Sequence, residues 1–257
     1  MKKNILFASA VLALSLVGGT AQAFAAEDGG TMPTNGTVNF VAGQDPTDPT
    51  DPTEPGNPIQ PIDPPTPVGG ALSIDYASNF KFGEQKISTD DETYYAALDQ
   101  FKGSDGETFG DSNYVQVTDK RGTLAGWTLT VGQLDQFKTA EGEALNGAQL
   151  KINTASAVAA VDDNSMDGYK PGTVASSITL TPGDGTTPGT SDAITAEKGK
   201  GAGTWVYRFG DTADAGKTAV QLMVPGKSVK LAKEYKTTLN WTLASIPENP
   251  ETPESGI

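Results

Sequence analysis

The chain has 257 residues, and its 32 acidic residues outnumber its 18 lysines and arginines to give a formal charge of −14. It contains neither histidine nor cysteine, which excludes disulfides, zinc sites built from imidazole and thiolate ligands, and nucleophilic catalysis that depends on histidine. A chain this acidic repels phosphate, so we expect no nucleic-acid partner.

The N-terminus has the pattern of a cleaved export signal. Two lysines precede an apolar run from Ile5 to Val17, and small residues at Ala23 and Ala25 offer cleavage sites. The run is too short to span a bilayer. We therefore predict a signal peptide over residues 1–25 and a secreted protein.

A three-residue repeat of acid, proline and threonine dominates residues 26–70. It runs from Asp45 to Pro55, and further prolines continue to Pro67. Proline at every third position favours the extended polyproline II conformation, in which the acids repel one another. The sequence thus predicts a stiff, solvated linker.

From residue 71 to residue 257 the pattern changes to short, β-branched segments separated by turns rich in glycine and proline. The predicted strands include Leu72–Ile74, Tyr114–Val117, Leu150–Ile152, Ile178–Leu180, Trp205–Phe209 and Val220–Val224. This pattern predicts an all-β fold, specifically an antiparallel β-sandwich of immunoglobulin-like or Greek-key type. Strand and helix both remain open for residues 90–101, and the composition of residues 184–203 predicts a long mobile loop.

Two segments share the tripeptide Trp-Thr-Leu, with Trp127 and Leu129 in the first and Trp241 and Leu243 in the second. In a strand, the tryptophan and leucine of each segment lie on one face. The tryptophans fit either packing in a core or stacking on a sugar ring. We expect the two strands to lie close together, and the first to complete a hairpin with the segment that begins at Tyr114.

Further marks surround the two tryptophans. Val117–Gly122 leads into Gly126–Val131, and Leu239–Leu243 stands a few residues before a proline-rich end. With the export signal and the acid-Pro-Thr repeat, these marks resemble the WxL-domain surface proteins of low-GC Gram-positive bacteria. The resemblance assigns residues 71–257 to a WxL-like domain.

The resemblance implies a non-catalytic protein that attaches non-covalently to the cell wall, with peptidoglycan or another wall polymer as its target. It also implies assembly into a surface complex with other WxL proteins and membrane-anchored partners. The end of the chain, residues 246–257, has no sorting motif for covalent attachment, which agrees with attachment through the folded domain. The alternative is an adhesin or scaffold whose main ligand is another bacterial protein or a host protein, such as one of the host matrix.

A basic stretch runs against the acidic trend of the chain. Lys227, Lys230, Lys233 and Lys236 belong to it. These lysines form either a wall-contact patch for phosphates or carboxylates, or a charged edge that prevents strands from pairing. Their spacing of three places them on alternate faces of an extended chain, which weakens the prediction of a single patch.

One segment is similar to the start of a calcium loop. Asp163, Ser165 and Asp167 alternate before Gly168, but Val174 stands where a bidentate glutamate belongs. We therefore expect a polar turn, with no metal and no other cofactor.

Three carboxylates close in sequence, Asp105, Glu107 and Asp111, raise the alternative of a wall hydrolase, because glycoside hydrolysis needs only two acids. Such clusters usually form turns. We therefore expect no catalytic site.

Overall fold

The computed structural model describes residues 32–66, 69–161 and 164–246. The predicted signal peptide lies outside them. The chain divides into two compact units, residues 1–39 and 40–257, and the strands all belong to the second. Within the described ranges, no helix is long and apolar enough to cross a membrane.

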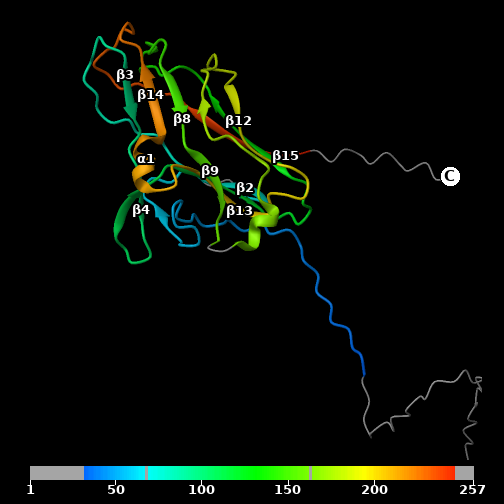
Figure 1. The fold of residues 1–257 in the computed structure, drawn as a ribbon. Helices are drawn as coiled ribbons and strands as arrows, with labels where there is room; N and C mark the ends of the chain where they lie inside the picture. The colour runs from blue at the N-terminus through cyan, green and yellow to red at the C-terminus, as the bar shows by residue number, and fades with distance from the viewer. Residues whose placement is uncertain (1–31, 67–68, 162–163, 247–257) are drawn as a thin grey trace, which may run out of the picture. The chain divides into compact units, whose positions relative to one another are not determined.

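In its described residues the second unit is built from four small antiparallel sheets (Figure 1). Sheet A has the order β1 (Gln60–Pro61), β4 (Asp99–Lys102), β5 (Thr108–Asp111). Sheet B has the order β10 (Thr173–Val174), β12 (Gly189–Ala196), β7 (Trp127–Gln133), β15 (Leu239–Ser245). Sheet C has the order β11 (Ile178–Thr179), β8 (Gln149–Ile152), β14 (Val220–Val224), β3 (Glu92–Tyr95). Sheet D has the order β2 (Leu72–Ala77), β6 (Tyr114–Asp119), β13 (Gly203–Phe209), β9 (Ala155–Ala159).

In the part of the chain that the structure describes, two short helices connect strands. The 3-10 helix η1 (Asn164–Tyr169) lies between β9 and β10, and α1 (Ala213–Ala219) lies between β13 and β14. Thr212 caps α1, since its Oγ1 accepts a hydrogen bond from the amide of Ala215 at 3.2 Å.

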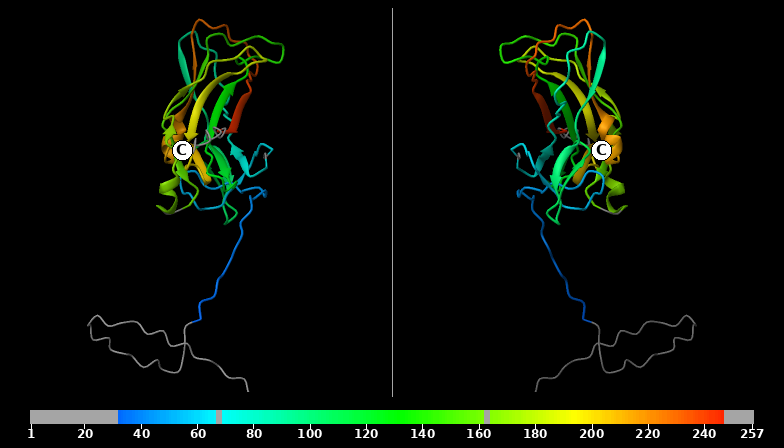
Figure 2. Two further views of the ribbon diagram at one scale, coloured as in Figure 1. Left: turned by 90° about the vertical axis from the view of Figure 1, so that its right-hand side faces the viewer. Right: turned by 90° about the vertical axis from the view of Figure 1, so that its left-hand side faces the viewer.

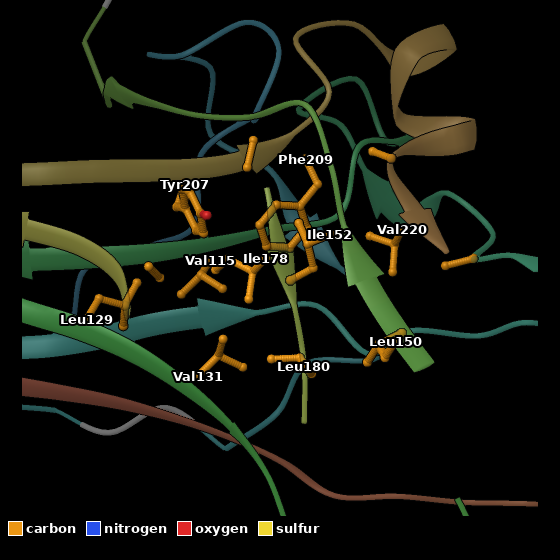
Figure 3. Packing of buried hydrophobic residues seen from close by; sticks show 14 of the residues in the cluster. Val115, Leu129, Val131, Leu150, Ile152, Ile178, Leu180, Tyr207, Phe209 and Val220 are labelled. Carbon is orange, nitrogen blue, oxygen red and sulfur yellow. The ribbon is translucent and has the colours of Figure 1, made fainter. Parts of the chain in front are cut away.

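The main core lies between sheets B, C and D. Each sheet contributes fully buried apolar side chains, which meet in Figure 3: Leu129 and Val131 from B, Leu150 and Ile152 from C, and Val115, Tyr207 and Phe209 from D. The predicted all-β class is confirmed. The sandwich is not clearly present, because one core is shared by three small sheets rather than enclosed by two facing layers.

The two Trp-Thr-Leu segments are neighbouring strands, as predicted. In the pairing of β7 with β15, Leu129 lies opposite Leu243 and Val131 lies opposite Trp241. The other neighbour of β7 is β12, which pairs with it from Gly189 to Ala196. The prediction of a long loop over residues 184–203 is therefore wrong, because this polar segment gains its strand conformation from pairing with β7 and from burial of Ile194.

The predicted hairpin between Tyr114 and the first tryptophan strand is also wrong. Strand β6 pairs with β2 and β13 in sheet D, whereas β7 lies in sheet B. The chain changes sheets through a turn that contains three residues with positive φ, Gly122 at 73°, Leu124 at 53° and Gly126 at 84°. Residues 90–101, left open by the sequence, form strands β3 and β4.

All six residues of β6 are buried. Alternate residues of a strand point to opposite faces, so both faces of β6 are covered. The core covers one face. Part of the acid-Pro-Thr repeat covers the other, where Thr50, Asp51 and Ile59 are buried.

The prediction of a solvated linker is therefore wrong for residues 43–62. The amide of Gly43 donates to the carbonyl of Lys120 at 3.2 Å, and β1 pairs with β4. In both views of Figure 2 the blue chain of this segment lies against the lower end of the second unit.

A turn at Asp51 replaces the expected polyproline conformation. Its Oδ1 accepts hydrogen bonds from the amides of Thr53 and Glu54, each at 2.8 Å. The amide of Asp51 donates to the carbonyl of Asn57 at 2.9 Å, which closes a hairpin. Aspartate followed by proline is a strong turn former, so in this part of the chain the repeat encodes a turn as well as a spacer.

The buried carboxylate of Asp111 lies beneath this turn. Its Oδ2 accepts a hydrogen bond from Thr53 Oγ1 at 2.5 Å, and its Oδ1 accepts one from the amide of Ser112 at 2.6 Å. Burial raises the pKa of Asp111 and the nearby carboxylate of Asp51 raises it further, although these hydrogen bonds oppose the shift.

We expect Asp111→Asn to remove a pH-dependent loss of stability. Because the pKa of Asp111 is higher in the folded state, the contribution of this carboxyl group to the wild-type free energy of unfolding is greatest below the ordinary value of 3.8 and falls as pH rises through the folded pKa. Denaturant unfolding of both proteins from pH 3.5 upward, about 0.5 units apart, measures the difference. An unchanged difference across this range would contradict the raised pKa.

We expect Gly126→Ala to destabilise the fold strongly, and Gly122→Ala is its matched control. Both glycines have positive φ, but an added Cβ at Gly126 would lie 2.4 Å from the carbonyl oxygen of Ala196, whereas nothing lies within 4 Å at Gly122. The free energy of unfolding should fall by about 1 kcal/mol at Gly122 and by about 3 kcal/mol or more at Gly126. Equal losses in denaturant unfolding would show that the contact with Ala196 does not matter.

Candidate functional site

Trp127 is completely buried, with 0% exposure. Its Nε1 donates a hydrogen bond to the carbonyl of Gly201 at 2.9 Å. Gly201 has a φ of 76°, and an added Cβ there would lie 2.3 Å from the indole nitrogen. The ring therefore has no free face for a sugar and contributes to the core.

Trp241 is half-buried on β15 and packs against two aromatic rings of sheet D. Its ring stacks on Phe209 with centroids 6.2 Å apart and planes at 18°, and it meets Tyr207 edge to face at 6.4 Å. Asn240 and Thr242 point to the opposite, exposed side. The tryptophan and leucine of each segment share an inward face, as predicted, and these contacts favour the core interpretation.

Arg121 belongs to the Val117–Gly122 segment and connects it to the segment of the first tryptophan. Its guanidinium forms an ion pair with the buried Asp119 at 2.7 Å and donates to the carbonyl of Gly126 at 2.9 Å. It also donates to Ser245 Oγ, at the end of β15, at 2.5 Å. The hydrogen bond with Asp119 raises the pKa of Arg121. This residue therefore fixes the turn between sheets D and B.

A groove of about 610 Å³ lies where the chain leaves β7 and approaches β15. One wall is formed by residues 134–141 and the other by residues 233–238. The amide of each of Lys138 and Lys236 donates to the carbonyl of the other at 2.9 Å. The groove is thus a continuation of the pairing between the two Trp-Thr-Leu strands.

Charged side chains of both signs line this groove, which we call the charged groove: Asp135, Lys138, Glu141, Lys233, Glu234 and Lys236. Lys233 forms ion pairs with Glu141 at 3.2 Å and with the neighbouring Glu143 at 3.5 Å, and Lys236 pairs with Glu234 at 3.0 Å. The ion pair with Lys138 lowers the pKa of Asp135. At neutral pH this carboxylate stays ionised, so the groove offers anions as well as cations.

The four predicted lysines have different environments. Lys233 and Lys236 line the charged groove, whereas Lys230 turns back and its Nζ donates to the carbonyls of Pro225 at 3.0 Å and Ser228 at 3.2 Å. Lys227 is exposed and does not line the groove. The sequence analysis did not identify Lys138 and Glu141, because they belong to the segment that follows β7, far from Lys233 in the chain, and no motif marks them.

The candidate carboxylates lie in contrasting environments. Asp105 and Glu107 are exposed near the turn between β4 and β5, whereas Asp111 is buried and bonded to Thr53. In the calcium-like segment, Asp163 lies outside the described residues, Asp167 belongs to η1, and Val174 lies in β10. Among the described residues, no group of three acidic side chains is placed to hold a metal ion.

The fold defines an all-β domain. A family model described as "WxL domain surface cell wall-binding" matches residues 27–247, so the chain belongs to the WxL domain family. The domain therefore associates with the cell-wall surface, and its family is one of binding rather than catalysis. No similar curated protein and no similar solved structure was found.

The two tryptophans should differ in their contribution to stability. Trp127→Phe removes the hydrogen bond to Gly201 and leaves a cavity, which we expect to cost about 2–3 kcal/mol of unfolding free energy. Trp241→Phe keeps an aromatic ring on Phe209 and should cost about 1 kcal/mol. Denaturant unfolding measures both, and a larger loss for Trp241→Phe would contradict this assignment.

Proposed function

We propose that the protein attaches non-covalently to peptidoglycan and that the charged groove is the contact site. The carrying observation is the set of exposed lysines and carboxylates that line one groove, including Lys138, Lys233 and Lys236. Family membership supports a wall ligand in general, and the chemistry of the groove supports this particular one.

The stem peptides of peptidoglycan carry free carboxylates and amino groups. Lysine side chains bind the former and carboxylates bind the latter through charge-assisted hydrogen bonds. A groove with charges of both signs therefore fits a peptide of mixed charge better than a polyphosphate, which only the lysines would attract. We accordingly propose the stem peptide, rather than teichoic acid, as the recognised group.

We further propose that the attached domain takes part in a surface complex with other WxL and membrane-anchored proteins. The exposed face of β15, where Asn240 and Thr242 lie beside the groove-forming segment, supports this role because it leaves polar surface for a partner. Export through the predicted signal peptide stays a prediction.

The double substitution Lys233→Gln and Lys236→Gln tests the site. Sedimentation of the full chain with purified peptidoglycan sacculi, with and without teichoic acid, should show binding to both preparations and about tenfold weaker binding by the double variant. Lys217→Gln, on α1, is the matched control, because Lys217 pairs only with Asp214 of the same helix. Thermal unfolding should be similar in all three proteins.

Other results would change the proposal. Wild-type protein that stays in the supernatant with both preparations would reject wall attachment through this domain and favour a protein ligand. Binding only to sacculi that carry teichoic acid would replace the stem peptide by phosphate. Release of muropeptides would support the hydrolase alternative.

A further inference from the structure

The outer face of sheet D carries polar side chains, although it is covered. The face that points away from the core carries Gln116 opposite Val206 and Thr118 opposite Thr204. Thr118 Oγ1 donates to Asp75 Oδ2 at 2.6 Å, and Gln116 Nε2 donates to the same oxygen at 3.0 Å. Asp75 leaves the Oε1 atom of Gln116 unpaired, and this buried atom is stable under a cover only if the cover supplies a hydrogen-bond donor.

The acid-Pro-Thr segment supplies these partners mainly through its backbone. Gln116 is 0% exposed, and its Oε1 accepts a hydrogen bond from the amide of Thr50 at 2.9 Å while its Nε2 donates to the carbonyl of Asp48 at 3.0 Å. One side-chain amide thus pairs with both backbone groups of an extended chain, in the manner of a neighbouring strand.

Three further side chains of the domain bind the segment on either side of Gln116. Arg208 Nη1 donates to the carbonyl of Pro52 at 3.2 Å. Lys120 Nζ donates to the carbonyl of Asp45 and, at 3.1 Å, to Thr47 Oγ1. Asp111 accepts the hydroxyl of Thr53.

An apolar contact anchors the end of the segment. Ile59 packs in a small cluster of its own with Tyr76, Phe101, Tyr114 and Val206. This cluster is separate from the main core. A row of backbone hydrogen bonds with one apolar anchor is the usual arrangement of a bound peptide.

We propose that the outer face of sheet D is a peptide-binding site for segments with the pattern Asp-Pro-Thr-acid-Pro-Gly. Residues 43–62 of the same chain occupy it in the structure, and the same segment of a second copy is its ligand in trans. The chain between β1 and β2, residues 62–71, contains Gly69 and Gly70, and a connection of this length reaches about 30 Å when extended, which permits exchange.

Tethering explains why the site is occupied by its own segment. A short connection holds a ligand at an effective concentration on the order of millimolar, so a micromolar intrinsic affinity keeps the segment bound. A second copy competes only where copies are crowded. The site therefore links neighbouring copies at high surface density and leaves isolated ones closed.

A full chain with a protease site inserted between Gly69 and Gly70 tests the proposal. The protein is purified intact and then cut, so that it folds with its segment attached. A fluorescent peptide of residues 36–66, which represents the segment of a second copy, is titrated against the cut and the uncut protein. We expect micromolar binding to the cut protein and at least tenfold weaker apparent binding to the uncut protein, where the tethered segment competes.

Two variant peptides locate the interaction. Thr50→Pro removes the amide hydrogen that Gln116 accepts and should weaken binding to the cut protein at least tenfold. Thr37→Pro makes the same change at an exposed residue before the contact segment and should bind like the wild-type peptide. Because both changes lie in the peptide, folding of the domain is unaffected.

Three results would overturn the proposal. Unfolding or permanent retention of the native segment after cleavage would show that residues 43–62 are a fixed part of the fold. Equal binding to cut and uncut protein would place the peptide elsewhere. Equal binding of the wild-type and Thr50→Pro peptides would show that the hydrogen bond from the peptide backbone to Gln116 does not contribute to binding.

Discussion

Burial of β6 on both faces is the constraint on which much of the structure depends. On the core-facing side Val115 and Val117 are apolar, but Gln116 and Thr118 on the other face are polar and equally inaccessible. Thr118 has its partner Asp75 within sheet D, but an apolar cover would leave Gln116 Oε1 without a partner at a cost of several kcal/mol. The backbone amide of Thr50 satisfies this oxygen, which explains why a proline-rich segment with few apolar side chains packs against the domain.

The residues that follow β6 connect this cover to the tryptophan strands. Lys120 binds the acid-Pro-Thr segment, whereas the next residue, Arg121, binds Gly126 and Ser245 on the side of sheet B. Adjacent side chains thus couple the outer face of sheet D to the ends of β7 and β15. The residues by which the sequence resembles its family, in Val117–Gly122 and around the two tryptophans, therefore make contacts that hold the sheets together.

Local patterns predicted individual strands well but not their partners. Alternation identified β7 and β15 and the face on which Trp127 and Trp241 lie, because that signal is contained in each segment. It did not identify β12 or separate β6 from β7, because those pairings depend on residues far away in the chain. The prediction of a solvated linker at Asp51 failed for a related reason, since proline spacing gives the conformation of an isolated chain but not of one bound to Gln116.

The candidate site was predictable only in part. Lys138 and Glu141 lie far from Lys233 in the chain, and the pairing of β7 with β15 brings them together.

Burial divides the charges of the domain into two kinds. The side chain of Asp119 is 3% exposed in its pair with Arg121, whereas Lys233 is 42% exposed in its pair with Glu141. Breaking a buried pair leaves an uncompensated charge and is strongly destabilising, but exposed pairs contribute little to stability. The lysines and acids of the charged groove can therefore exchange their present partners for those of a ligand without loosening the fold. The net charge of the chain does not show this difference, because ligand binding depends on which ion pairs can exchange partners and not on the sum of the charges.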